Sequence, residues 1–171
     1  MSELNAYATW GGSFLMASAM MFAIHETGHA VLCKMAGVQV RGIGLGILSG
    51  LFVLRFDGDK PTLKWTPRRA IPHIVALAPP VGWWRIAIAA AGPLAGFSAA
   101  LVMLAFGHGD VFSHEGAAQH PFSFGVEALG LGTLLNLVPF ISCGVPTDGA
   151  YILTGIRRMR AERQYRGRNL Q

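Results

Sequence analysis

The sequence predicts an α-helical integral membrane protein. We expect one domain over residues 1–171, with three core transmembrane helices and a small membrane-associated β-hairpin or sheet. The first reason is composition: 52% of the residues are hydrophobic and only 13% are charged, against roughly 25% in soluble domains. The second is that three uncharged runs are long enough to cross a bilayer, namely Leu4 to Ile24, Ile86 to Phe106 and Ala128 to Thr147. The mean hydropathy of +0.43 agrees.

The distribution of basic residues is the third reason. The net charge is +5, and all fourteen Lys and Arg lie in 34–85 or in 157–168. A nucleic-acid-binding surface does not need such long gaps between basic residues, whereas the positive-inside rule of membrane proteins produces them. We therefore expect no nucleic-acid partner and a multi-pass protein of a bacterial inner membrane. Its N-terminus should lie outside and its C-terminus in the cytoplasm, which requires three crossings.

The first helix is expected over about residues 4–33. No basic segment precedes its apolar run and no small-residue cleavage site clearly ends it, so a retained span fits better than a cleaved signal peptide. After it, the segment Gly42 to Leu54 is uncharged, alternates glycine with larger apolar residues at 42–47, and is too short to span. That segment is either a strand whose edge pairs with an extended peptide or a glycine-rich connecting hairpin.

The second helix is expected over 86–106, where Gly92 and Gly96 form a G-x-x-x-G pattern that favours close helix packing. The third is expected over 122–156 and is interrupted by Pro139 and Pro146. Because backbone groups freed at membrane depth need partners, such a break lines a protein cavity and marks a candidate site. Residues 157–171 are expected to form a basic cytoplasmic tail, which also suits anionic lipid head groups.

The first span ends in an H-E-x-x-H motif that begins at His25. Positions i and i+4 share one face of a helix, so His25 and His29 can both bind one zinc ion. The alternative is a pair of buried structural histidines. That alternative does not explain Glu26, because a carboxylate costs roughly 2.5–3.5 kcal/mol in the middle of a span. The motif predicts one catalytic Zn²⁺ with Glu26 as the general base.

A catalytic zinc site needs a third protein ligand, and depth in the membrane selects Asp148. If the stretch before Arg157 is helical, Asp148 lies ~13 Å above the inner interface, and His29 lies ~8 Å above it by the same rise per residue. These depths are similar enough to bring the carboxylate to the two histidines. Five other acidic residues are less well placed, because they lie in predicted loops or at the outer end of the third span: Asp57, Asp59, Asp110, Glu115 and Glu127.

Three parts of the sequence resemble the site-2 protease family of intramembrane zinc metalloproteases. They are HETGHA at 25–30, AGPLAG at 91–96, and NLVPF at 136–140 followed by PTDG at 146–149. These segments occur in the family's order. The resemblance extends from the first span to the last motif, which is nearly the whole chain.

The resemblance implies roles for two residues near the end of the chain. Asp148, which precedes a glycine in the last motif, would be the third zinc ligand, and Asn136 would hold the substrate backbone. The resemblance also implies a membrane-embedded sheet near residues 42–54. This sequence departs from many members in its longer interval between Asn136 and Asp148, where residues 141–145 intervene.

The sequence therefore predicts a zinc-dependent intramembrane endopeptidase that cleaves transmembrane segments of other membrane proteins. Regulated intramembrane proteolysis and clearance of signal-peptide remnants are the two family-level roles. The expected partners are the lipid bilayer, a transmembrane-helix substrate, and a regulatory membrane protein or a second copy. The first alternative is a zinc-stabilised membrane scaffold or chaperone subunit without turnover, against which the presence of Glu26 argues. The second is a metal carrier, but the internal repeat common in transporters is missing.

Two other sets of residues receive structural assignments. The outer loop contains three histidines, His108, His114 and His120, which are expected to be solvated and not to bind a second metal. The two cysteines, Cys33 and Cys143, lie in apolar surroundings and are expected to be small buried residues.

Overall fold

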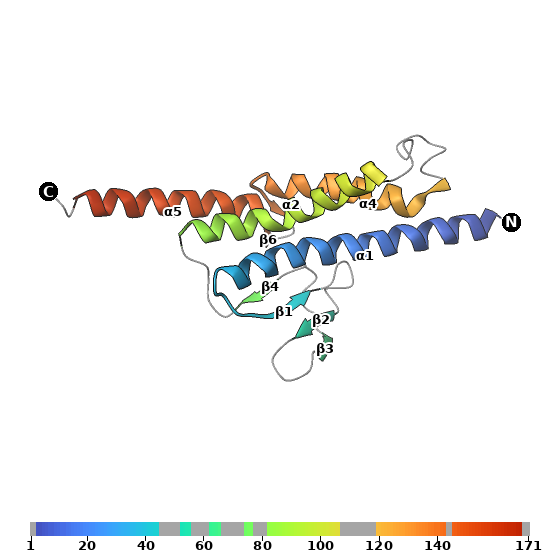
Figure 1. Cartoon of the computed structure of the whole chain (residues 1–171), viewed down its shortest axis with the longest axis horizontal. Coiled ribbons are helices and arrows are strands. Elements are labelled where there is room, and N and C mark those ends of the chain that lie inside the picture. The colour runs from blue at the N-terminus through green and yellow to red at the C-terminus, as the bar shows by residue number, and fades with distance from the viewer. Residues whose placement is uncertain are drawn as a thin grey trace.

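The computed structural model describes residues 3–44, 52–55, 62–65, 74–76, 82–106, 119–142 and 145–168. Within these ranges the chain is mostly helical, with a small sheet between the first two long helices in sequence (Figure 1). The helices are α1 (Glu3–Met35), α2 (Trp83–Phe106), α4 (Pro121–Gly132) and α5 (Asp148–Arg168). A short 3-10 helix, η2 (Thr133–Leu137), follows α4 directly.

The helix α2 occupies the centre of the bundle. It packs against α1, α4 and α5, while α1 also packs against α4. Of the described helices, α2 is the one that is long and apolar enough to cross a membrane by length and composition. The two helices expected near residues 4–33 and 86–106 are present as α1 and α2, but three membrane crossings remain a prediction.

Small residues set the distances between these helices. A Cβ atom added at Gly28 of α1 would lie 2.5 Å from the Ala91 carbonyl oxygen of α2. Added at Gly125 of α4, it would lie 2.8 Å from the Cβ atom of Ala17 in α1. The helix backbones are therefore in close contact, as in membrane helix pairs where van der Waals packing drives association.

The third predicted helix is interrupted in two steps, first by a change from α-helix to 3-10 helix and then by the end of the 3-10 helix before Pro139. The α-helical turns of α4 end at Gly132, and η2 ends at Leu137, before Pro139. Proline disfavours helical geometry in the preceding residue and cannot donate a backbone hydrogen bond, so the chain leaves the helix there. A hairpin of β5 (Ile141–Ser142) and β6 (Val145–Pro146) then leads into α5. The five residues 141–145 noted in the sequence thus lie largely in a β-hairpin.

The strands after α1 form a four-stranded antiparallel sheet in the order β3-β2-β1-β4. Their bounds are β1 (Val40–Gly44), β2 (Phe52–Arg55), β3 (Thr62–Trp65) and β4 (Ile74–Ala76). The sheet contacts α1, on the side away from α2 and α4 in Figure 1. At the end of α1, Gly37 adopts a φ of 72°, a left-handed conformation that favours glycine and turns the chain towards β1.

The strand order corrects one expectation about residues 42–54. Gly42 pairs with Arg55 of β2 on one side and with Val75 of β4 on the other, so β1 is an inner strand. The strand β2 is also flanked on both sides, by β1 and β3. Neither strand therefore has a free edge for an extended peptide, and the edges of the described sheet belong to β3 and β4. The described ends of this segment pair as antiparallel neighbours in β1 and β2, which agrees with the hairpin alternative, and residues 45–51 lie outside the described residues.

Candidate metal centre

The helix α1 supplies two of the three polar groups of this site. His25 and His29 are one helical turn apart, and both are buried. Their Nε2 atoms lie 3.1 Å apart, and the two rings meet edge to face. The two imidazoles lie on one face of α1, and each directs its Nε2 atom to the same point.

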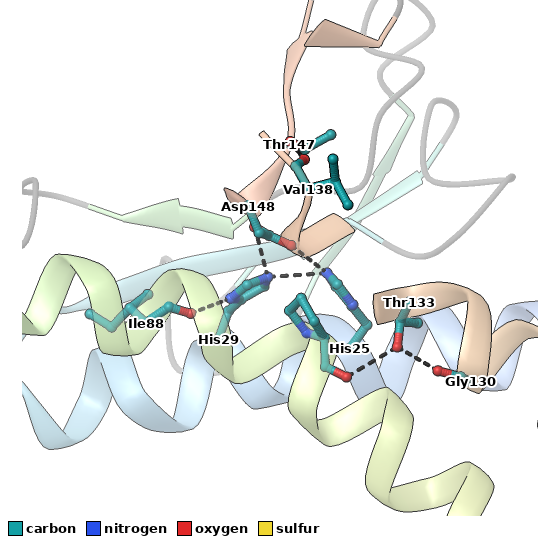
Figure 2. A network of polar contacts seen from close by, with 9 residues as sticks. His25, His29, Ile88, Gly130, Thr133, Val138, Thr147 and Asp148 are labelled. Carbon is teal, nitrogen blue, oxygen red and sulfur yellow. Dashed lines mark hydrogen bonds and ion pairs between the residues drawn. The ribbon is translucent and has the colours of Figure 1, made fainter. Parts of the chain in front are cut away.

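The third group comes from the first residue of α5. Asp148 Oδ2 lies 3.2 Å from His25 Nε2, and Asp148 Oδ1 lies 3.4 Å from His29 Nε2. Figure 2 shows the carboxylate facing both imidazoles. The structure thus brings together the three residues that the sequence predicts as metal ligands, although Asp148 is distant from the histidines along the chain.

The donor set and its spacing fit a zinc ion. The potential ligand atoms of His25, His29 and Asp148 lie within 4.8 Å of one another. Within the described part of the chain, these three residues form the cluster of His, Cys, Asp or Glu side chains that could hold a metal ion. Ligands bound tetrahedrally to zinc at ~2.0–2.1 Å are separated from one another by about 3.3–3.4 Å. The three distances of 3.1, 3.2 and 3.4 Å are close to that separation.

A backbone carbonyl of α2 orients one of the two imidazoles. His29 Nδ1 lies 2.6 Å from the Ile88 carbonyl oxygen. Because a carbonyl oxygen only accepts hydrogen bonds, Nδ1 is the donor, and a neutral His29 then keeps its Nε2 lone pair for a metal. The contact also fixes the ring plane relative to α2, as outer hydrogen bonds do for metal-binding histidines.

Gly92 provides space next to the two histidine nitrogens. A Cβ atom at this position of α2 would overlap His29 Nε2 and would lie 2.7 Å from His25 Nε2. The absence of a side chain at Gly92 therefore leaves the space beside both nitrogens open. Sequence reasoning assigned Gly92 to helix packing and missed this role. The G-P-x-x-G segment around it was the available signal, but the face of α2 that meets the histidines is not visible in the sequence.

The residues on either side of Asp148 are held against the chain that follows η2. The Thr147 hydroxyl donates to the Val138 carbonyl oxygen at 2.7 Å. A Cβ atom at Gly149 would overlap the Leu137 carbonyl and lie 2.7 Å from the Val138 carbonyl carbon. Both neighbours of the carboxylate are therefore in tight contact with residues 137–138.

The other two predicted site residues are Glu26, which follows His25 in the sequence, and Asn136, which precedes the segment that packs next to Asp148. Glu26 is buried in α1 next to His25. Asn136 lies in η2 and is partly exposed, directly before the segment that packs on Gly149. The general-base role of Glu26 and the substrate-binding role of Asn136 remain predictions.

Several other polar residues are separate from the three ligands. Glu127 is completely buried in α4, beside the cluster formed by Ala17, Met21 and Val126. Cys33 is buried with a free thiol, as expected. Cys143 and the loop histidines His108 and His114 lie outside the described residues, so their predicted environments are not tested.

The comparison with protein families now decides the assignment. Residues 13–127 match the model of peptidase family M50. The chain belongs to peptidase family M50. This is the site-2 protease family that the sequence motifs suggested. No curated protein and no solved structure matches the chain.

M50 membership establishes the broad class of the protein. M50 peptidases are membrane-embedded metalloproteases, generally dependent on zinc, so this chain is a membrane-associated hydrolase of that type. The matched range includes His25, Glu26, His29 and Gly92 and ends before Asn136. The case for Asp148 as a ligand therefore depends on the distances to the two histidines.

Proposed function

We propose that this M50 peptidase is a zinc-dependent endopeptidase of the site-2 type, which cleaves transmembrane segments of other membrane proteins. The observation that carries the proposal is the convergence of His25, His29 and Asp148. Two imidazole nitrogens and a carboxylate face one point inside a helical bundle, at spacings suited to one zinc ion. Three protein ligands leave a fourth position for water or substrate, which distinguishes catalytic zinc sites from structural ones.

The proposed reaction is hydrolysis of one peptide bond. Zinc at such a site supplies Lewis acidity, which polarises a peptide carbonyl and makes a water molecule more acidic. Glu26 accepts a proton from the attacking water as the oxygen bonds to the carbonyl carbon. Glu26 then returns that proton to the amide nitrogen as the carbon–nitrogen bond breaks. The products are a new carboxyl terminus and a new amine, and Glu26 is again a carboxylate.

The surroundings of Asp148 suit an apolar substrate. Val138, Phe140 and Ile141 belong to the segment that is hydrogen-bonded to Thr147, the residue before Asp148, and their side chains are exposed. A transmembrane helix must unwind locally before its backbone reaches the ligands, because its carbonyls are bonded within the helix. Asn136, with an amide that can both donate and accept, is the proposed holder of the extended backbone.

The central test uses Glu26→Gln, which keeps the side-chain size and removes the proton acceptor. We expect the variant to bind about one zinc per chain, like the parent protein, and to cleave at least ~100-fold more slowly. Membrane peptides from host cells that produce the parent protein or the variant are compared by proteomics. Uncleaved substrate should accumulate with the variant and co-purify with it.

The ligand variants provide the matched comparison. Replacing His25, His29 or Asp148 singly by Ala should weaken zinc binding strongly and remove cleavage, whereas Glu26→Gln should remove cleavage alone. If Glu26→Gln produces the same membrane peptides as the parent protein, the chain acts without proteolysis, and the scaffold alternative replaces this proposal.

We also propose the membrane arrangement that the charge pattern predicts. The chain would cross a bacterial inner membrane three times, with the basic end of α5 in the cytoplasm. Its partners would be the lipid bilayer, the substrate segment and a regulatory membrane protein or second copy. The described basic residues beyond the middle of α5 are exposed, which suits a cytoplasmic tail: Arg157, Arg158, Arg160 and Arg163.

A further inference from the structure

Thr147 lies between the β5–β6 hairpin and α5, directly before Asp148, and it is 9% exposed. Its hydroxyl donates to the Val138 carbonyl oxygen at 2.7 Å, with the Phe140 carbonyl oxygen as a longer alternative at 3.1 Å. The same oxygen accepts the Phe140 N–H at 3.2 Å. The Thr147 N–H also donates to the Phe140 carbonyl, at 3.0 Å. One residue thus ties the start of α5 to the segment between η2 and β5.

The Thr147 hydroxyl does not make the hydrogen bond that is usual for a residue directly before a helix. The Thr147 carbonyl accepts N–H groups of Ala150 and Tyr151, so Thr147 precedes the first turn of α5 at the place of an N-cap. An N-cap threonine ordinarily turns its side-chain oxygen to the N–H groups of its own helix. Here the hydroxyl bonds residues 138 and 140 instead. Its contribution is therefore to the connection between two segments and not to the end of one helix.

We infer that Thr147 is a positioning residue for the third metal ligand, holding Asp148 at the place where its carboxylate meets His25 and His29. The inference rests on the proposed zinc site. Asp148 is the only one of the three groups that does not come from α1, so its location depends on how α5 is fixed. The hydroxyl of Thr147 and the close packing of Gly149 fix the residues on both sides of it. The same bonds connect this ligand to the chain that follows Asn136.

The prediction concerns zinc affinity, measured on the purified full-length protein by competition with a chromophoric chelator. Thr147→Val keeps the shape and removes the hydroxyl, so zinc binding should weaken ~10–100-fold, the usual effect of losing a group that orients a ligand. Thr147→Ser keeps the hydroxyl and should bind zinc within ~3-fold of the parent protein on the same reasoning. Thr154→Val is the control, because Thr154 donates to Ala150 within α5 and is exposed.

A double-mutant cycle separates positioning from general stability. In protein that already carries Asp148→Ala, adding Thr147→Val should leave the residual zinc affinity unchanged, because the ligand that Thr147 positions is gone. An equal loss in both backgrounds would overturn the inference. If Thr147→Val does not fold, the Ser variant decides: weakened zinc binding in Thr147→Ser contradicts the inference, and parent-like binding supports it.

The design also distinguishes this inference from the proposed function. If the parent protein binds no zinc, or if His25→Ala binds zinc as well as the parent protein does, the proposed zinc site itself is wrong. If the parent protein binds zinc in that way and Thr147→Val binds it equally well, the zinc site stands and the role of Thr147 alone is disproved.

Discussion

Gly92 shows how a missing side chain contributes to this site. The nitrogens of His25 and His29 approach the α2 backbone so closely that a single added carbon would lie between them. The tight contact of Gly28 with Ala91 brings α1 to that distance. The two glycines therefore act together, since Gly28 permits the approach of the helices and Gly92 leaves space beside the two histidine nitrogens at the point of approach.

Gly92→Ala tests this role directly. The added methyl group would displace the imidazole nitrogens from the position they need, so we expect zinc affinity to fall at least ~10-fold. Gly12→Ala in α1 is the control, because a Cβ atom there meets nothing within 4 Å. Zinc affinity is measured by competition with a chelator, and folding by circular dichroism. Parent-like zinc binding in Gly92→Ala would show that the site tolerates a side chain at this position.

The predictable part of the site follows from local spacing. His25, Glu26 and His29 are visible because an i, i+4 pair on a helix is a property of one segment. Asp148 needed an argument from depth, which uses the helix rise and the positions of basic residues. Gly92 and Thr147 were not predicted as site residues. Their roles depend on contacts between segments that are distant in the sequence, and no periodicity reports such contacts.

At the scale of elements, α4 provides two glycines with opposite environments. A Cβ atom at Gly130 would lie 2.5 Å from the Ala100 Cβ atom and 2.8 Å from the Gly96 carbonyl oxygen, both in α2. A Cβ atom at Gly132 meets nothing within 4 Å, and the backbone there has a right-handed helical conformation. The same substitution at these two positions therefore separates the effect of packing from that of helix propensity.

We expect Gly130→Ala to lower the free energy of unfolding by about 1–3 kcal/mol, because the methyl group forces α4 away from α2. Gly132→Ala should leave that free energy unchanged or raise it by about 0.5–1 kcal/mol, since alanine favours a helix over glycine. Equilibrium unfolding of the protein in detergent micelles measures both. Equal effects of the two substitutions would argue against close packing of α2 and α4.

The elements differ in how far their sequences determine them. The long apolar runs predicted α1 and α2, because a helix of that length depends mainly on its own composition. The alternation of glycine at 42–47 indicated a strand, but the place of β1 in the sheet depends on its pairing with β2 and β4, which lie later in the chain. That pairing places β1 in the interior of the sheet and was not predictable from its own residues. The prolines correctly marked the break after η2.

At the scale of the whole molecule, the orientation in the membrane depends on the basic blocks. In a variant with Cys33 and Cys143 replaced, Ser113→Cys should react with a membrane-impermeant thiol reagent added outside intact cells. Glu162→Cys, in the exposed half of α5, should react only after the membrane is opened. The reason is that segments rich in Lys and Arg stay in the cytoplasm. Labelling of Glu162→Cys in intact cells would contradict three crossings.

The origin of the three converging groups has a consequence for biosynthesis. His25 and His29 leave the ribosome early, while Asp148 is translated only after α2 and α4 are complete. At roughly 5–20 residues per second, several seconds separate the first two groups from the third. Under the proposed function, the growing chain lacks the third ligand during that time, so it would not yet hydrolyse neighbouring membrane segments. Hydrolytic activity would then begin only when the start of α5 has joined α1.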